Sequence, residues 1–307
     1  MFQCFTILKP RILLVYPLFA LCGLYFIPSG VHFLLAIPNG KLTFKFQNAG
    51  GFKFVDLNNA SQRPPVLFLH GLLGNPEGWF DAAAALATRK CRAIVPYLPI
   101  DHMPRGQANV GGLVNYVREF TDFLDIDSMV LVGNSLGGQI ALRYSIDYPE
   151  HIAALILSGS SGIYETEIGT KTFRRQDRVF IRAKAEKSFY DPAMVTDELI
   201  DRIHELATDR FRALRIVWVA RSSVNDLVID DLGEIKAPTL LIWGAEDQIT
   251  PPDVAHTFDR MMPSTQLHFI EKCGHAPMME HPDTFNEIMI DFLEHSIDRI
   301  TLPSVPI

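Results

Sequence analysis

The feature that most constrains the fold is an alternation between short apolar runs and longer segments with helical periodicity. The apolar runs have no polar face, which is typical of strands buried on both sides of a parallel sheet. They cover residues 66–69, 93–95, 129–132, 154–157, 239–243 and 266–270. The segments with helical periodicity cover residues 79–88, 111–124, 137–148, 254–262 and 282–295. This alternation predicts an α/β fold with a mostly parallel, doubly wound sheet.

Two parts of the chain depart from this alternation. Residues 42–46 and 52–57 alternate apolar with polar side chains on either side of Asn48-Ala49-Gly50-Gly51, which predicts an antiparallel hairpin. Residues 161–236 are rich in charge and hold no clear strand, so we predict a helical lid inserted before the penultimate strand. The chain then divides into an apolar segment at 1–40, an α/β core at 41–160 and 237–307, and the lid at 161–236.

The composition excludes several classes of function. The chain has 28 Lys and Arg against 35 Asp and Glu, a net charge of -7, so we expect no nucleic-acid partner. Its four cysteines, at positions 4, 22, 91 and 273, form no CxxC pair and have no histidines at ligand spacing. We therefore predict neither a metal site nor a dithiol site, and interpret the cysteines as buried free thiols.

The N-terminal segment is unusually apolar. Residues 12–40 contain no Asp, Glu, Lys or Arg. A membrane-spanning helix needs about 20 apolar residues, and residues 12–37 are long enough, but Pro17 and Pro28 disfavour one straight helix. We expect an uncleaved anchor or interfacial segment that associates the protein with a membrane. The alternatives are a cleaved export signal and a segment packed on a soluble exported or cytoplasmic domain.

The sequence Gly133-Asn134-Ser135-Leu136-Gly137 places the pattern G-x-S-x-G between an apolar strand and a helix. A tight strand-to-helix turn forces the central residue into a strained backbone conformation, and the two glycines leave room for that turn. In an arbitrary loop the same pattern would leave Ser135 as a polar turn residue. The strand and helix around it favour a nucleophile, whose developing negative charge the helix N-terminus stabilises.

A serine nucleophile needs a base. His275 follows the last predicted strand and should lie at the same edge of the sheet as Ser135, so we predict that it is the general base. His281 leads into the last helix and His268 lies within a strand, which makes both weaker candidates. Cys273 is a weaker candidate for the nucleophile than Ser135.

A carboxylate must hold the histidine in the correct tautomer and stabilise its charged form. Asp247 follows another predicted strand and lies between Ser135 and His275 in the chain. We predict Asp247 in this role. The neighbouring Glu246 is interpreted as a solvated turn residue.

An oxyanion formed at the reacting carbon needs two preorganised backbone donors. The first is the amide of Leu136, next to the nucleophile. We assign the second to Leu72, in the loop His70-Gly71-Leu72-Leu73-Gly74 that follows the first core strand. His70 is interpreted as a structural, hydrogen-bonding residue of this loop. This chemistry requires no metal and no organic cofactor.

Together these motifs resemble the α/β-hydrolase superfamily over about residues 42–295. The chain is similar to small bacterial esterases, non-haem haloperoxidase-like hydrolases and C–C bond hydrolases with a helical lid, and a membrane anchor would make it similar to monoacylglycerol lipases. Ser135 stands where haloalkane dehalogenases and epoxide hydrolases have aspartate. The C–C hydrolases usually have a glycine- and proline-rich oxyanion loop and an aromatic residue after the histidine, whereas this chain has Leu72-Leu73-Gly74 and Ala276.

We predict a serine hydrolase that cleaves a carboxylic ester or related acyl bond of a small molecule through an acyl-enzyme on Ser135. A C–C bond hydrolase of the meta-cleavage type, on the same triad, is the alternative that the lid and Asn134 support. A thioesterase or acyltransferase would share the acyl-enzyme step. A non-catalytic, ligand-binding member of the fold would be expected to lack a triad residue, and none is missing.

The lid supplies side chains that are able to shape a substrate pocket. Its aromatic residues are available to line the pocket, although most are expected in the core of the lid: Phe173, Phe180, Phe189, Phe211 and Trp218. Its arginines are able to bind a carboxylated substrate, although a solvated or salt-bridged face is the simpler interpretation: Arg174, Arg175, Arg178, Arg210, Arg215 and Arg221.

Overall fold

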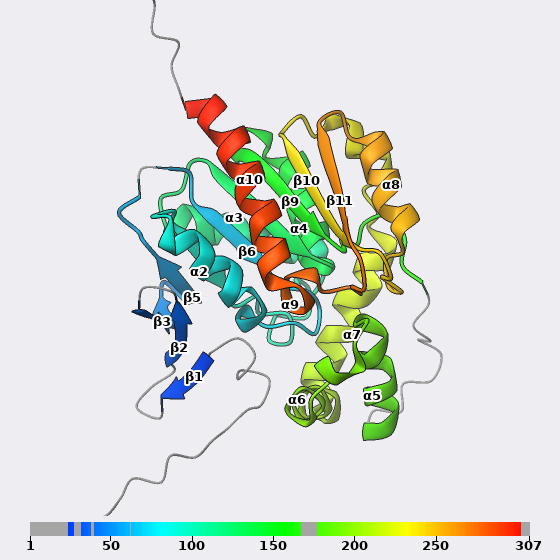
Figure 1. Ribbon diagram of the computed structural model, residues 1–307. Helices are drawn as coiled ribbons and strands as arrows, with labels where there is room; N and C mark the ends of the chain where they lie inside the picture. Colours follow the sequence, from blue (N-terminus) through cyan, green and yellow to red (C-terminus); the bar gives the residue numbers. More distant parts are fainter. Residues whose placement is uncertain (1–23, 28–31, 38–39, 62, 167–176, 302–307) are drawn as a thin grey trace, which may run out of the picture.

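The alternating segments form a sheet of eight strands in the order β11-β10-β9-β8-β6-β7-β5-β4 (Figure 1). The computed structural model describes residues 24–27, 32–37, 40–61, 63–166 and 177–301. All neighbouring strands from β7 to β11 pair in parallel, which confirms the predicted fold class. These strands are β6 (Val66–Leu69), β7 (Ala93–Pro96), β8 (Met129–Asn134), β9 (Ile152–Ser158), β10 (Thr239–Gly244) and β11 (Thr265–Ile270).

Helices cover both faces of this sheet (Figure 1). One face carries α2 (Phe80–Thr88) and α10 (Pro282–Thr301), and the other carries α3 (Val110–Phe123), α4 (Leu136–Asp147) and α8 (Pro252–Met261). In β8 the side chains of Val130 and Val132 enter the core under α2 and α10, and those of Met129 and Leu131 enter the core under α3, α4 and α8. Because both sides of the strand are buried, its sequence has no polar face.

The edge strand β11 differs from the central ones. Gln266 and His268 are exposed, and burial alternates along the strand. The prediction that this run is buried on both faces was therefore wrong. An edge strand pairs with only one neighbour, here β10, and α8 covers only part of it.

The predicted N-terminal hairpin forms with a different first strand. β4 (Gln47–Ala49) pairs antiparallel with β5 (Phe52–Leu57), and β5 in turn pairs antiparallel with β7. Gly50 and Gly51 both have positive φ, so the turn is only two residues long and fixes Ala49 opposite Phe52. Residues 42–46, the expected partner, belong mostly to β3 (Gly40–Lys45), in a separate three-stranded sheet with β2 (His32–Ile37) and β1 (Leu24–Ile27).

The predicted anchor is only partly within the described residues. Its described portions form the strands β1 and β2 and no continuous helix. Among the residues that the structure places, no helix is both long and apolar enough to cross a membrane. Residues 12–23 of the anchor, with Cys4 and Cys22, lie outside the described ranges, and membrane association through residues 12–37 stays a prediction.

A helical insertion lies between β9 and β10, where the lid was predicted (Figure 1). It contains α5 (Arg178–Ala185), α6 (Asp197–Thr208) and α7 (Arg210–Asn225). The side chain of Asp209 accepts hydrogen bonds from the first amides of α7 and so separates the two longer helices. Residues 167–176, which include Phe173, Arg174 and Arg175, are outside the described part of the chain.

The third helix of the insertion, α7, is bonded to the segment that follows β7. Arg212 forms an ion pair with the buried Asp101, and Arg215 donates a hydrogen bond to the carbonyl of Met103. The remaining short helices are α9 (Pro277–Glu280) and the 3-10 helices η1 (Pro76–Trp79), η2 (Pro149–His151), η4 (Glu186–Ser188), η5 (Pro192–Met194) and η6 (Ile229–Glu234).

The packing of α10 on the sheet generates a stability prediction. Phe285 is fully buried, with its ring centroid 5.9 Å from that of Trp79. We expect Phe285→Ala to lower the free energy of unfolding by about 3–5 kcal/mol, through lost burial and an unfilled cavity. Urea denaturation measures the change. The exposed Glu287→Ala on the same helix serves as the control, and a similarly small change in both variants would contradict this packing.

Candidate active site

Ser135 occupies the sharp turn between β8 and α4. Its φ of 55° and ψ of -122° put a residue other than glycine in a strained conformation. Both flanking glycines are required for the turn. A Cβ atom at Gly133 would lie 2.3 Å from the carbonyl oxygen of Gly137, and one at Gly137 would lie 2.2 Å from that of Leu69. The structure thus has the backbone geometry that the sequence predicts around Ser135.

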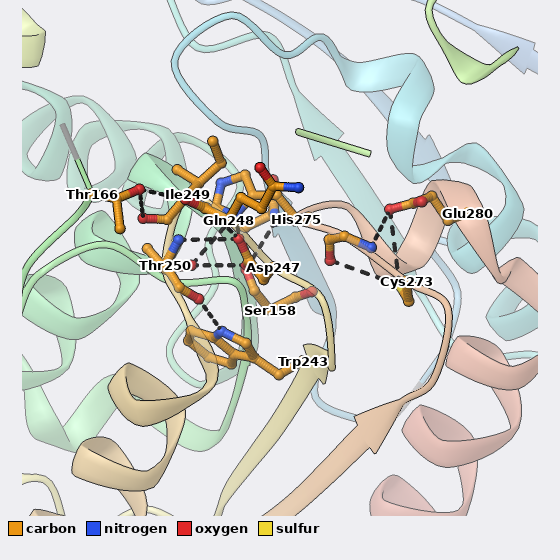
Figure 2. Close-up of polar contacts among 12 residues, drawn as sticks. Ser158, Thr166, Trp243, Asp247, Gln248, Ile249, Thr250, Cys273, His275 and Glu280 are labelled. Atoms are coloured by element: carbon orange, nitrogen blue, oxygen red, sulfur yellow. Dashed lines mark hydrogen bonds and ion pairs between the residues drawn. The ribbon is translucent and has the colours of Figure 1, made fainter. Parts of the chain in front are cut away.

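Asp247 and His275 meet at the same edge of the sheet (Figure 2). Oδ2 of the fully buried Asp247 side chain lies 2.9 Å from Nδ1 of His275. The carboxylate also accepts hydrogen bonds from the amides of Ile249 and Thr250 and from the Thr250 hydroxyl. Because these donors come from one short loop, the carboxylate has a fixed orientation toward the imidazole.

The other nitrogen of His275 is free. Its Nε2 is buried and has no hydrogen-bond partner among the described residues. With the proton on Nδ1, where it is donated to Asp247, Nε2 carries a lone pair that accepts a proton from a nucleophile. The pair therefore has the arrangement of a general base and the carboxylate that orients it.

Asn134 connects the turn at Ser135 to residues 271–276, the loop that carries His275, which we call the histidine loop. Its side-chain amide donates to the carbonyls of Ser158 and His275, each at 2.9 Å. The amide of Ser135 itself donates to Ser158 at 3.2 Å. Ser135 and His275 are thus tied to one another through the backbone at the end of β9.

Gly159 belongs to the site although the sequence reasoning missed it. A Cβ atom there would lie 2.9 Å from Nδ1 of His275 and 3.1 Å from Oδ2 of Asp247, and the residue has a φ of +49°. A side chain would therefore push into the pair. The only signal in the sequence is a glycine directly after a core strand, which is too common to assign a role.

The two predicted oxyanion donors both flank Ser135. A Cβ atom at Gly71 would be 3.2 Å from Cβ of Ser135, so the loop that carries Leu72 passes beside the nucleophile. Leu136 is the first residue of α4, where an amide has no partner within the helix. In the described ranges, neither the Leu72 nor the Leu136 amide donates a hydrogen bond to another residue, so both are available to an oxyanion.

His70 has the structural role that was predicted. Its Nε2 accepts from the amide of Leu98 at 3.1 Å, and its Nδ1 lies 2.9 Å from the carbonyl of Gly71. Burial lowers the pKa of His70 to about 4. The imidazole is therefore neutral at physiological pH, and it holds the oxyanion loop against the chain that follows β7.

The competing residues lie elsewhere or do other work. His268 is exposed on β11, and His281 contacts the carbonyl of Lys272. Burial raises the pKa of the Cys273 thiol, which makes it a poor nucleophile. The interpretation of Glu246 as a solvated turn residue was wrong, because its half-buried carboxylate accepts a hydrogen bond from the amide of Cys273 at 3.0 Å.

The side chains of the insertion vary in burial. Phe189 is buried, whereas Phe211 is largely exposed. Arg178 forms an ion pair with Asp201, and Arg215 binds a carbonyl of the core, in keeping with the structural interpretation of these arginines. Among the predicted arginines that the structure describes, none donates a hydrogen bond to the oxyanion loop, whereas another arginine does.

That residue is Arg202, on α6, which the sequence reasoning did not single out. Its Nη2 donates to the carbonyl of Leu73 at 3.3 Å, and its Nε is buried without a partner in the described part of the chain. Burial lowers the pKa of Arg202 and raises that of the nearby Glu77. Helical periodicity could have indicated that Arg202 faces inward, because it shares one face of α6 with Leu199, Ile203 and Leu206.

The known proteins that this chain resembles are hydrolases. A model of the alpha/beta hydrolase family matches residues 66–288. The chain is 32% identical over 267 residues to a 2-hydroxy-6-oxo-6-phenylhexa-2,4-dienoate hydrolase from Burkholderia cepacia, covering 78% of this chain and 91% of that protein. It is 30% identical, with the same coverage, to a 2-hydroxy-6-oxononadienedioate/2-hydroxy-6-oxononatrienedioate hydrolase from Comamonas testosteroni.

Solved structures agree in fold. An α/β hydrolase enzyme from a sediment metagenome of the Mar Chica lagoon is 30% identical, with a TM-score of 0.66, and the match covers 81% of this chain and 98% of that one. A meta-cleavage product hydrolase from Pseudomonas fluorescens IP01 has a TM-score of 0.69 at 22% identity, over 82% of this chain and 97% of its own. At that identity the likeness shows the fold alone.

The position of Gly159 generates a prediction for the site. We expect Gly159→Ala to lower kcat on the order of 100-fold, because the added Cβ displaces the His275–Asp247 pair. Steady-state kinetics measure this with any substrate that the wild type turns over. The matched control is Gly51→Ala, which also has a positive φ but no atom within 4 Å of the new Cβ. Equal activity in the two variants would show that the contact with the pair has no catalytic consequence.

Proposed function

The chain belongs to the α/β-hydrolase family, and from that premise we propose that it hydrolyses a carbon–carbon bond beside a ketone in a carboxylated substrate. Ser135 is the nucleophile in this proposal, His275 the general base and Asp247 the group that orients His275. The observation that carries the proposal is the likeness to hydrolases named for 2-hydroxy-6-oxo dienoates. Such a compound has no ester, so its hydrolysable bond is the carbon–carbon bond next to the 6-oxo group.

The proposed mechanism uses the contacts of His275. Because Asp247 accepts a hydrogen bond from Nδ1–H of His275 at 2.9 Å, Nε2 carries the lone pair that is able to take the proton of Ser135. The serine oxygen then attacks the carbonyl carbon, C6, and the Leu72 and Leu136 amides stabilise the oxyanion. Before this attack, the 2-hydroxyl proton of the substrate shifts to C5, which gives a 2-oxo group and a C3=C4 double bond. When the C5–C6 bond breaks, its electron pair is delocalised through C3=C4 onto the 2-oxo oxygen, and the resulting dienolate takes the proton from His275. Water, activated by the same imidazole, finally hydrolyses the acyl-enzyme to a carboxylic acid and frees Ser135.

Arg202 supports the carboxylated substrate class. A guanidinium remains charged even when buried, and the buried Nε of this one lacks a partner in the described residues. The residue also forms no ion pair there, although the carboxyl of Glu77 is near enough for the Arg202 charge to lower its pKa. A substrate carboxylate would supply the missing acceptor. The names of both relatives describe substrates that carry such a group.

Ester hydrolysis through the same triad is the second candidate, and one observation favours it. C–C hydrolases usually carry an aromatic residue directly after the histidine, whereas this chain has the small, buried Ala276. The oxyanion loop likewise has Leu72-Leu73 in place of a glycine- and proline-rich sequence. An acyl-enzyme on Ser135 serves both reactions, so the two candidates differ in the leaving group and in the pocket that accepts it.

Substrate turnover separates the two candidates. We expect the wild type to consume 2-hydroxy-6-oxo-6-phenylhexa-2,4-dienoate faster than p-nitrophenyl esters, and Ser135→Ala to lower kcat by about 1,000-fold or more. The exposed Ser264→Ala is the control. Absorbance follows both reactions, and a fluorophosphonate probe reports the reactivity of Ser135. Ester turnover without dienoate turnover would select the second candidate, and turnover of both at wild-type rate by Ser135→Ala would exclude the triad.

Substrate charge tests the role of Arg202. We expect Arg202→Met to raise KM for the dienoate by roughly 10- to 100-fold, the equivalent of one charge-assisted hydrogen bond. The KM for an uncharged ester should change far less. Arg178→Met, which removes an arginine paired with Asp201 on the exposed side of the insertion, is the matched control. Equal effects of Arg202→Met on charged and uncharged substrates would contradict a carboxylate contact.

A further inference from the structure

The carboxylate of Glu280 has contacts that the proposed mechanism does not use. Glu280 ends α9, five residues after His275. One of its oxygens accepts a hydrogen bond from the amide of Gly274 at 2.8 Å, and the other accepts one from the amide of Tyr190 at 2.7 Å. Figure 2 shows the carboxylate beside Cys273 in the loop that leads to His275. The two amides belong to segments more than 80 residues apart in the sequence.

The Tyr190 amide belongs to a segment of the insertion that lies directly against the histidine loop. We call residues 186–191 the strap. The carbonyl of Ser188 accepts a hydrogen bond from the amide of His275 at 2.9 Å. A Cβ atom at Gly274 would lie 2.9 Å from the Cα atom of Phe189, so the two backbones are in close contact. The buried Phe189 ring shares a core cluster with Cys273 and Ala276.

Two consecutive amides of the histidine loop therefore depend on this junction. The amide of Gly274 is held by Glu280, and the amide of His275 is held by the strap. Displacing the strap would leave the His275 amide without its acceptor, and an unpaired buried amide is destabilising. The backbone that carries the imidazole would then relax, and the ring would lose its alignment with Ser135.

The surroundings of Glu280 suit a structural carboxylate of this kind. Burial raises its pKa, while the amides of Tyr190 and Gly274 oppose that effect by stabilising the charged form. Lys272, Asp191 and His281 line the same open groove, so the group is not sealed in an apolar core. In the described residues no side chain other than Glu280 contacts both the strap and the histidine loop through hydrogen bonds.

We propose that Glu280 is a positioning residue that couples docking of the strap to the orientation of His275. The two oxygens of one carboxylate hold the helical insertion and the histidine loop in a single arrangement. Correct placement of the insertion over the core thereby becomes a condition for an active histidine. The inference rests on the proposed role of His275 as the base for Ser135.

The reactivity of Ser135 toward a fluorophosphonate probe tests this coupling, because the probe needs an active base but no particular substrate. We expect Glu280→Gln to slow labelling by about 10- to 100-fold, since a misplaced base costs rate without unfolding the chain. Hydrogen exchange should quicken together at residues 186–191 and 272–276. Unchanged labelling in a folded Glu280→Gln variant would overturn the proposal.

A backbone substitution tests the strap contact by itself. Tyr190→Pro removes the amide N–H that donates a hydrogen bond to Glu280. The preceding Phe189 already has the extended backbone that a following proline favours. Tyr190→Pro should slow labelling as Glu280→Gln does, and the double variant should be no slower than either. Wild-type labelling of Tyr190→Pro would overturn the coupling. If that variant does not fold, unchanged exchange at residues 186–191 in Glu280→Gln would overturn it equally.

A second contact between insertion and core provides the matched control. Asp226 forms an ion pair with Arg143 at the end of α7, remote from the strap in the sequence and bonded to a different helix. Asp226→Asn should leave the labelling rate within about threefold of the wild type, as for a partly exposed ion pair. A loss as large as that of Glu280→Gln would show that any weakened docking of the insertion inactivates Ser135, and would overturn the specific role of Glu280.

Failure of the proposed function has a different signature. A wild-type protein that the probe does not label would remove the triad itself. Hydrogen exchange in Glu280→Gln would still report whether the carboxylate joins residues 186–191 to residues 272–276. Normal labelling of the wild type and of Glu280→Gln, by contrast, would leave the triad in place and remove only the coupling.

Discussion

The strained turn at Ser135 is the constraint around which the site is arranged. A residue other than glycine in that conformation costs about 1–3 kcal/mol, and it persists only where the surrounding structure holds it. Here β8 lies in the middle of the sheet with both faces covered, and α4 is buried along most of its length. The close approach of Gly137 to the carbonyl of Leu69 packs the start of that helix against β6. The central sheet therefore supports the strained backbone conformation of Ser135.

The remaining groups are aligned by bonds that start from this turn. Asn134 joins it to the ends of β9 and of the histidine loop, and the loop after β10 presents Asp247 to Nδ1 of His275. The insertion contributes as well, because the carbonyl of Ser188 in the strap accepts a hydrogen bond from the His275 amide. Ser135, Asp247 and His275 thus follow the ends of three parallel strands, as the topology predicts for residues of one site, while the insertion supplies the surroundings. Ester hydrolysis and carbon–carbon bond hydrolysis would use the same three residues and would differ in the substrate pocket that the insertion helps to form.

The sequence was sufficient where one short segment determines the result. The central strands were predictable because both of their faces are buried, and the strained turn at Ser135 was predictable because two glycines and a strand-to-helix boundary coincide. The same reasoning failed for the partner of β5. The turn at Gly50 and Gly51 pairs β5 with the three residues of β4, whereas residues 42–46 belong mostly to another sheet. It also missed Gly159, Arg202 and Glu280, whose roles arise from contacts between segments far apart in the chain. No local pattern distinguishes Gly159 from an ordinary glycine or Glu280 from a surface glutamate, and only its place among the apolar residues of α6 separates Arg202 from other helix arginines.

The absence of a side chain at Gly159 has a consequence for how such a chain is able to diverge. Any larger residue there would meet Asp247 and His275 together, so substitution at this position would disturb the hydrogen bond between them. The exposed positions of the insertion, such as Phe211 and Val179, meet no such restriction. Sequence change is therefore better tolerated at the exposed positions of the insertion than at the end of β9.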